Sequence, residues 1–109
     1  MPAERISAKE LQRQLQAGDR PLLVIDVRQR QRYEAGHVPG ALHIPLAKLE
    51  AALPELPKDR PIVTYCGGGT SGIRAANLLL EHGFDARVME GFSAWQRAGL
   101  PVETGGGTT

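Results

Sequence analysis

The sequence has little cysteine, little net charge and no long apolar run, and each shortage excludes a class of protein. A single cysteine rules out an internal disulfide framework and a cysteine-rich zinc site. A formal net charge of +1 gives no electrostatic case for nucleic acid or an acidic membrane as a partner. No run approaches the length of a membrane span, and the start lacks the apolar stretch of a signal peptide. We therefore expect a cytoplasmic protein with a free thiol.

The composition is that of an ordinary globular domain. With 109 residues, 41% hydrophobic and 23% charged, the chain is long enough for one core but not for two. We expect one domain over residues 1–104. The glycine- and threonine-rich end, residues 105–109, is expected to be a flexible tail.

Apolar runs alternate with helical patterns along the chain. The unbroken run Leu22–Val27 is typical of a strand buried on both faces of a parallel sheet. We expect a short strand that ends at Ile6 and further strands over the runs 22–27, 41–44, 62–65 and 86–89. We expect a first helix after a capping box formed by Ser7 and Glu10, and further helices over 46–53, over 73–81 and in a short segment after Gly91. Gly36, Pro39 and Gly40 predict a structured loop over 33–40. The alternation predicts an α/β domain with a mostly parallel sheet.

The most informative stretch surrounds the cysteine. The run Ile62–Tyr65 leads into Cys66, three glycines follow, and a helical pattern begins at Ile73. A strand, a glycine turn and a helix together aim backbone N–H groups at an anion, and the helix N-terminus adds positive potential. Both effects favour a thiolate, or an anion carried on its sulfur. The candidate loop consists of Gly67, Gly68, Gly69, Thr70, Ser71 and Gly72.

The alternative is that Cys66 is a small buried apolar residue that ends a strand before a flexible turn. For an arbitrary lone cysteine that interpretation would be preferred. Here the three glycines and the helix favour the functional one, because a simple turn rarely needs such permissive backbone directly after a cysteine.

Four motifs in order carry a family resemblance. They are Asp26-Val27-Arg28, the stretch Tyr33–Ala41 with Gly36-His37-Val38-Pro39-Gly40, the loop Cys66–Ser71, and the closing pair Gly91–Trp95 and Gly99–Val102. Across nearly its whole length the chain resembles the single-domain rhodanese sulfurtransferases. The resemblance implies a five-stranded, mostly parallel sheet flanked by helices on both faces, with no cofactor and no metal. It also implies that Cys66 takes sulfane sulfur from thiosulfate or a persulfide and passes it to cyanide, a thiol or a protein acceptor.

The residues around the cysteine suit that chemistry. A persulfide anion needs several N–H donors near its terminal sulfur, and the loop from Gly67 to Ser71 can supply them. The hydroxyls of Thr70 and Ser71 either donate to the persulfide or cap the following helix. No second cysteine can resolve the intermediate, so the acceptor must come from outside the chain.

The loop departs from the family pattern because it carries no charged side chain, and Ser71 stands where an arginine is common. Arg32 is then the candidate for binding the donor anion, against the alternative of a solvated surface charge. Arg28 is a second substrate-binding candidate, although pairing with Asp26 is the favoured interpretation. Asp26 and His37 are expected to support the structure, His37 as a hydrogen-bonding residue rather than a general base.

Three other functions are considered. A phosphatase of the C-x5-R type is disfavoured, because it needs arginine at the position of Gly72, and Arg74 comes two residues too late. A regulatory rhodanese module and a sulfur carrier that acts with a protein partner are the other two. His43 and His82 have no ligand-like partners in the sequence, and Phe92 and Trp95 are expected in the core.

Overall fold

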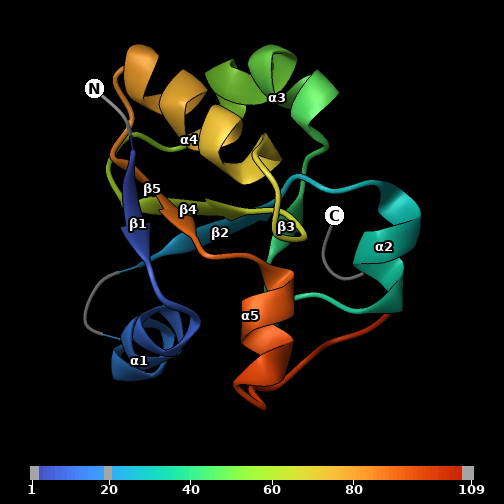
Figure 1. The fold of residues 1–109 in the computed structure, drawn as a ribbon. Coiled ribbons are helices and arrows are strands. Elements are labelled where there is room, and N and C mark those ends of the chain that lie inside the picture. The colour runs from blue at the N-terminus through green and yellow to red at the C-terminus, as the bar shows by residue number, and fades with distance from the viewer. Residues whose placement is uncertain (1–2, 19–20, 107–109) are drawn as a thin grey trace.

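The computed structural model describes residues 3–18 and 21–106, and these form one parallel sheet covered by helices. The five strands have the order β1-β5-β4-β2-β3. All four neighbouring pairs are parallel (Figure 1). Their bounds are β1 Glu4–Ile6, β2 Leu23–Asp26, β3 Leu42–His43, β4 Ile62–Tyr65 and β5 Ala86–Met89. The predicted fold class and every predicted strand are confirmed.

Strand β4 lies in the middle of the sheet, and all four of its residues are buried. Its register with β2 pairs Asp26 with Tyr65, so the two strands end level with each other. The backbone N–H of Val27 donates to the Tyr65 carbonyl at 3.1 Å, which extends the pairing one residue further. The segments that begin at Arg28 and Cys66 therefore leave the sheet side by side at its carboxyl edge.

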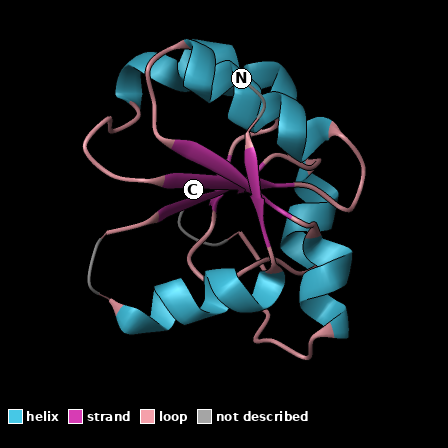
Figure 2. Cartoon of the chain, turned by 60° about the vertical axis from the view of Figure 1, so that its left-hand side comes forward, coloured by secondary structure: helices cyan, strands magenta, loops and turns pink. Residues whose placement is uncertain are grey.

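Helices cover both faces of the sheet, as predicted (Figures 1 and 2). One face carries α3 (Leu46–Ala52) and α4 (Ser71–Glu81), whose Leu49, Ala76 and Leu79 pack on Ile25 and Ile62. The other face carries α1 (Ala8–Ala17) and α5 (Phe92–Arg97), with α2 (Arg30–Ala35) beside them. Trp95 and Phe92 lie in this second core, as expected.

The helix ends follow the sequence signals in part. Ser7 caps α1, accepting a hydrogen bond from the Glu10 N–H at 3.0 Å, and Gly18 ends it with φ 66°. Glu10 does not complete the predicted capping box, because its carboxylate accepts hydrogen bonds from Arg13 and Gln14 instead. Those bonds, the one from Arg13 first, lower the pKa of Glu10 to about 2.

The prediction of a structured loop over 33–40 is wrong in its first half, because Tyr33–Ala35 belongs to helix α2. This helix has only six residues and buries only Tyr33, so it has no periodic apolar face to reveal it. Tyr33 anchors it by donating a hydrogen bond to the Ala41 carbonyl at 2.8 Å. After α3 the chain continues as a 3-10 helix, η1 (Leu53–Glu55), that contains Pro54.

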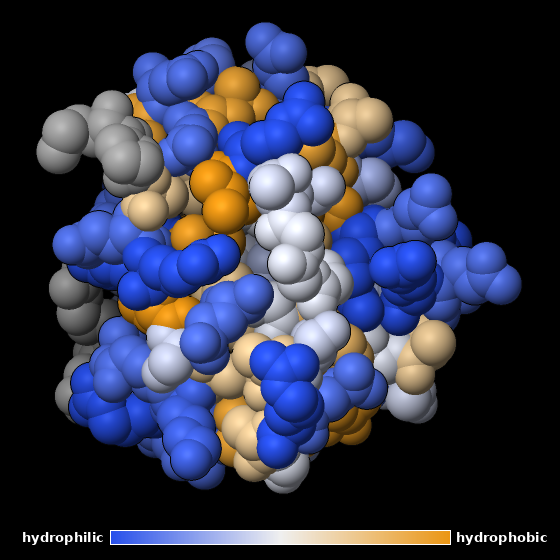
Figure 3. Space-filling view, in the orientation of Figure 1, coloured by the Kyte–Doolittle hydropathy of each residue, from blue (hydrophilic) through white to orange (hydrophobic). Residues whose placement is uncertain are grey.

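The face in Figure 3 has hydrophilic side chains spread over it with apolar surface between them. Among the described residues, Val102 is the only large hydrophobic residue that counts as exposed. None of the helices described has the length and apolar character needed to cross a membrane. Most of the predicted tail, residues 107–109, lies outside the described residues, while Gly105 donates to the Glu34 carbonyl at 2.8 Å.

Candidate active site

A pocket of about 600 Å³ opens at the carboxyl ends of β2 and β4. It is lined by residues of three segments: Val27, Arg28, Gln29 and Arg32; Cys66, Gly67, Gly68, Gly69 and Ser71; and Ser93. The structure therefore brings Cys66, most of its loop and both candidate arginines to one place. The lining holds two guanidinium groups and no carboxylate, so it suits an anion.

Cys66 directly follows β4 and is 8% exposed. Its carbonyl accepts a hydrogen bond from the Phe92 N–H at 2.8 Å, which ties the start of the loop to α5. The thiol is free and faces the pocket as one of its lining groups. Although Cys66 is buried, its place in the pocket lining at the end of the central strand suits a nucleophile.

The backbone N–H groups of residues 67–71 donate to no other protein atom in the described part of the chain. Gly67 and Ser71 are partly buried, whereas Gly68, Gly69 and Thr70 are exposed, so water can satisfy these N–H groups until an external acceptor replaces it. Helix α4 begins at Ser71 and contributes its N-terminal potential to the same place.

Glycine is required most clearly at Gly72 and Gly91, where other backbone atoms approach closely. Of Gly67, Gly68 and Gly69, only Gly68 has a positive φ, and its value of 158° is close to extended backbone. In contrast, a Cβ on Gly72 would lie 3.1 Å from the Cys66 nitrogen. Gly91, with φ 136°, would place a Cβ 2.9 Å from the Gly68 Cα. These two glycines let α4 and the start of α5 approach the loop.

Thr70 and Ser71 differ in position. Thr70 is the N-cap of α4 but makes no capping hydrogen bond with its side chain. Ser71 is the first residue of the helix and lines the pocket, whereas Thr70 and Gly72 do not line it. The Gly72 carbonyl accepts a hydrogen bond from the Thr64 hydroxyl at 2.7 Å, which fixes the first turn of α4 on the sheet.

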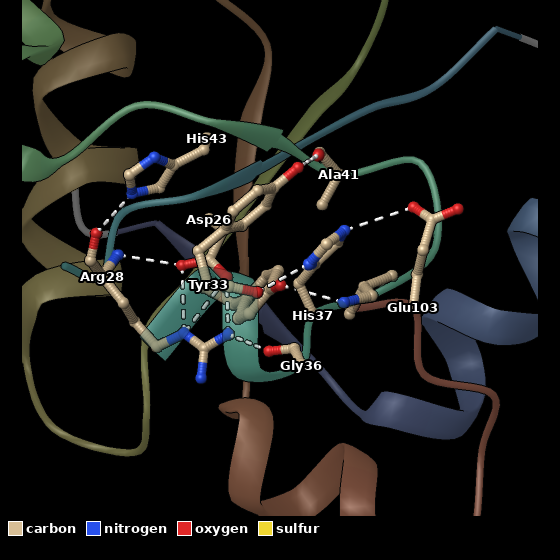
Figure 4. Close-up of polar contacts among 10 residues, drawn as sticks. Asp26, Arg28, Tyr33, Gly36, His37, Ala41, His43 and Glu103 are labelled. Atoms are coloured by element: carbon tan, nitrogen blue, oxygen red, sulfur yellow. Dashed lines mark hydrogen bonds and ion pairs between the residues drawn. The ribbon is translucent and has the colours of Figure 1, made fainter. Parts of the chain in front are cut away.

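Asp26 and Arg28 form a buried ion pair at the side of the pocket that Arg28 lines (Figure 4). Asp26 is fully buried, and the Arg28 side chain is 8% exposed. Arg28 Nη2 lies 2.7 Å from Asp26 Oδ2 and donates to the Gly36 carbonyl at 2.6 Å. Its guanidinium also lies 4.4 Å from the centre of the Phe92 ring. Burial alone would lower the pKa of Arg28, but the hydrogen bond and charge of Asp26 outweigh it and raise the pKa.

Arg32 has a different environment. It projects from α2, is exposed, and forms no ion pair with the residues the structure describes. A Cβ placed on Gly67 would lie 3.6 Å from Arg32 Nη1, so the guanidinium reaches the glycine loop. Arg32 is thus the pocket cation that is available to a ligand, while Arg28 is held by protein groups.

His37 is fully buried, does not line the pocket, and sits in a polar network (Figure 4). Its Nδ1 is 2.7 Å from the Tyr33 carbonyl, its Nε2 is 3.2 Å from Glu103 Oε1, and its ring stacks on Tyr33 at 3.8 Å. The Tyr65 hydroxyl oxygen accepts a hydrogen bond from the Val38 N–H at 3.0 Å. Burial, followed by the charge of Asp26, raises the pKa of Tyr65. These contacts hold the turn that supports Arg28.

The remaining candidates lie away from the thiol. His43 is buried with Nε2 2.8 Å from the Arg28 carbonyl, and His82 is exposed with Nδ1 3.0 Å from the Leu78 carbonyl. Arg74 lines a separate groove between α3 and α4 rather than the Cys66 pocket. Within residues 3–18 and 21–106, no cluster of three or more His, Cys, Asp or Glu could hold a metal ion.

Sequence reasoning missed Gln29 and Ser93 as pocket residues. Ser93 donates a hydrogen bond from its hydroxyl to the Gly67 carbonyl at 2.9 Å. Its position two residues after Gly91, inside the closing motif, was the available signal. That signal was weak because the two partners are 26 residues apart in the sequence.

Comparison with known proteins agrees with this geometry. A family model described as rhodanese-like domain matches residues 7–98. A curated relative, the HTH-type transcriptional regulator Rv0324 of Mycobacterium tuberculosis, is 39% identical over 107 residues, which is 95% of this chain and 46% of that protein. The chain thus spans about half the length of this relative.

Solved structures are similar as well. The BH2092 protein of Bacillus halodurans superposes with a TM-score of 0.85 at 27% identity, covering 94% of this chain and 77% of that one. The rhodanese-like domain of the Anabaena Alr3790 protein gives a TM-score of 0.79 at 33% identity, covering 95% and 80%. The sheet order, the cysteine loop and these matches lead to one conclusion: the chain belongs to the rhodanese-like domain family.

Proposed function

We propose that the chain is a sulfurtransferase in which Cys66 carries the transferred sulfur as a persulfide. The observation that carries the proposal is the coincidence, in one pocket, of the only thiol, an available guanidinium and the residues Gly67, Gly68, Gly69 and Ser71, whose backbone N–H groups donate to no atom of the described chain. Donors of the class R–S–S⁻ or thiosulfate combine a transferable sulfur with an anionic end, and the pocket offers a partner for each part.

The first half-reaction breaks one bond and forms one. The Cys66 thiolate attacks the outer sulfur of the donor, a new S–S bond forms, and the donor's S–S bond breaks with both electrons on the leaving group. Sulfite leaves from thiosulfate, and a thiolate leaves from a persulfide. The N–H groups of residues 67–71 stabilise the negative charge on the terminal sulfur of the enzyme persulfide.

The second half-reaction needs an external acceptor. A nucleophile such as cyanide or a thiol attacks the terminal sulfur, and the Cys66 thiolate leaves. No second cysteine is present to form an internal disulfide. The exposed rim of the pocket leaves the terminal sulfur open to a small acceptor or to a protein acceptor. A free thiol fits a reducing compartment, so we propose that the activity is cytoplasmic.

Arg32 and Arg28 have separate roles in the proposal. Arg32 meets the anionic end of the donor, because it lines the pocket and forms no ion pair with the part of the chain that the structure describes. Arg28 forms part of the wall, and Asp26 and His37 support it from behind. Phosphatase chemistry is disfavoured, since Arg74 lies in the α3–α4 groove and cannot clamp a phosphate on Cys66.

A second candidate function is a regulatory or sulfur-carrier module that acts with a protein partner. The observation favouring it is that the relative named as an HTH-type transcriptional regulator is about twice as long as the region matched here. The chemistry at Cys66 would be shared, and the acceptor would differ.

Intact-mass measurement tests the proposal. After incubation with thiosulfate or a low-molecular-weight persulfide, the protein should gain the mass of one sulfur atom, and cyanide should remove it. Cys66→Ser should gain no mass and should not turn over. Transfer that persists in Cys66→Ser would refute the mechanism. Loading by persulfide followed by release only to a protein acceptor would favour the carrier function.

A further inference from the structure

Ser93 makes an unusual double contact with the cysteine loop. It is the second residue of α5 and lines the pocket. Its backbone N–H lies 3.2 Å from the Gly67 carbonyl oxygen, and its hydroxyl donates to the same oxygen at 2.9 Å. In the described chain this is the one hydrogen bond that a side chain makes to residues 67–71.

The direction of a carbonyl fixes the direction of the next N–H. The described residues contain no cis peptide bond, so the N–H of Gly68 points opposite to the carbonyl of Gly67. Donors that hold the Gly67 oxygen towards α5 therefore turn the Gly68 N–H away from α5. The Phe92 N–H acts in the same way one peptide earlier, since it holds the Cys66 carbonyl at 2.8 Å.

The loop needs such restraint because its own residues provide little. Glycine populates positive and negative φ about equally, so three in succession permit many directions for their peptides. A Cβ on Gly69 would meet nothing within 4 Å, which shows open space around that end of the loop. The Phe92 restraint comes from the backbone alone, whereas the Ser93 restraint depends partly on a side chain.

We propose that the Ser93 hydroxyl is a positioning residue for sulfur transfer: by holding the Gly67 carbonyl it keeps the Gly68 N–H directed at the anion carried on Cys66. This inference rests on the proposed function. It assigns to Ser93 an effect on the backbone N–H groups that stabilise the anion. Binding of the sulfur donor is assigned to Arg32 instead.

Three variants test it: Ser93→Ala, Ser93→Thr as the conservative variant, and Gln96→Ala as a control at an exposed position of the same helix that does not line the pocket. Ser93→Ala should lower kcat with thiosulfate roughly three- to tenfold, as for a lost neutral hydrogen bond, and leave KM unchanged. Ser93→Thr should recover most of kcat, and Gln96→Ala should behave like the wild type.

A second measurement does not depend on turnover. Amide NMR of the free protein should show faster motion or exchange for Gly67–Gly69 in Ser93→Ala, with an unchanged melting temperature. If wild-type protein takes up no sulfur but the loop still loosens, the proposed function fails and only the loop restraint stands. An unchanged kcat with an unchanged loop overturns the inference. A raised KM with an intact kcat also overturns it, because Ser93 would then bind the donor directly.

Discussion

Two segments leave the sheet side by side, and they are built in opposite ways. The segment after β2 is rich in side chains whose polar groups are paired within the protein: Asp26 with Arg28, Arg28 with Gly36, and His37 with Tyr33. The segment after β4 has almost no side chains, and its N–H groups from 67 to 71 are unpaired in the described chain. The first segment forms a rigid wall of the pocket, which consists of paired side chains such as Asp26 and Arg28. The second segment supplies backbone N–H groups that can bind a ligand.

The difference shows how a small domain can separate stability from reactivity. Buried charges are costly unless they are paired, so the Asp26–Arg28 wall cannot rearrange without a large loss of free energy. Unpaired backbone donors at a pocket surface are satisfied by water until a ligand replaces it. The N–H groups of residues 67–71 can therefore bind a ligand without breaking a bond within the protein, while the Asp26–Arg28 pair stabilises the structure around them.

The largest expected effect comes from breaking the wall. Asp26→Ala leaves the Arg28 guanidinium buried without its carboxylate, so the free energy of unfolding should fall by about 3–5 kcal/mol. Chemical denaturation measures this. Arg30→Ala is the matched control, because the Arg30–Glu34 pair is 67% and 45% exposed and should contribute less than about 1 kcal/mol. Equal losses in both variants would contradict the contrast between a buried and a surface pair.

The next effect concerns substrate choice. Arg32→Ala removes the pocket cation that forms no ion pair within residues 3–18 and 21–106, so kcat/KM with thiosulfate should fall roughly tenfold to a hundredfold, or about 1.5–3 kcal/mol. A neutral or bulkier sulfane donor should be affected much less. Steady-state kinetics with both donors separate the outcomes. An unchanged efficiency would make Arg32 a solvated charge, and equal losses with both donors would make it a support for the pocket.

A smaller effect tests the packing of the loop. Gly91→Ala forces a side chain onto φ 136° and towards the Gly68 Cα at 2.9 Å, so the free energy of unfolding should fall by about 1–3 kcal/mol and activity should fall with it. Gly69→Ala is the control, since its Cβ would enter open space. Thermal melts and sulfur loading of both variants check this. If Gly69→Ala is as damaging as Gly91→Ala, the requirement lies in flexibility and not in close approach.

The contrast between the two segments also explains what the sequence could predict. The strands and the cysteine loop were predictable because their signals are local: β4 is an unbroken apolar run, and the glycines directly follow Cys66. Helix α2 was not predictable because it buries only Tyr33. The role of Ser93 was hidden because its contact with Gly67 is created by the fold across 26 residues.

The smallest effect concerns Glu103, which contacts the turn that supports Arg28. Glu103 pairs through its backbone with His37, at 2.8 and 2.9 Å, and its carboxylate accepts hydrogen bonds from the Gly40 N–H and from His37 at 3.2 Å (Figure 4). The Gly40 N–H, followed by His37, lowers the pKa of Glu103 below its usual value of 4.5. A carboxyl whose pKa is lower in the folded state stabilises the fold above its unfolded pKa, and this stabilisation is lost as the pH falls through the folded value.

Glu103→Gln should therefore lower the melting temperature slightly near neutral pH, and the difference from the wild type should shrink as the pH falls below about 4.5. The loss should stay small because the side chain is 47% exposed and a glutamine oxygen can still accept from Gly40. Melting curves of both proteins across the acid range give this difference directly, and the other carboxyl groups cancel from it. A difference that is constant with pH would mean that Glu103 acts through packing and not through its charge. In that case only the backbone pairing of Glu103 with His37 would stabilise the turn, and a lower pH would not change the hydrogen bond from Arg28 to the Gly36 carbonyl.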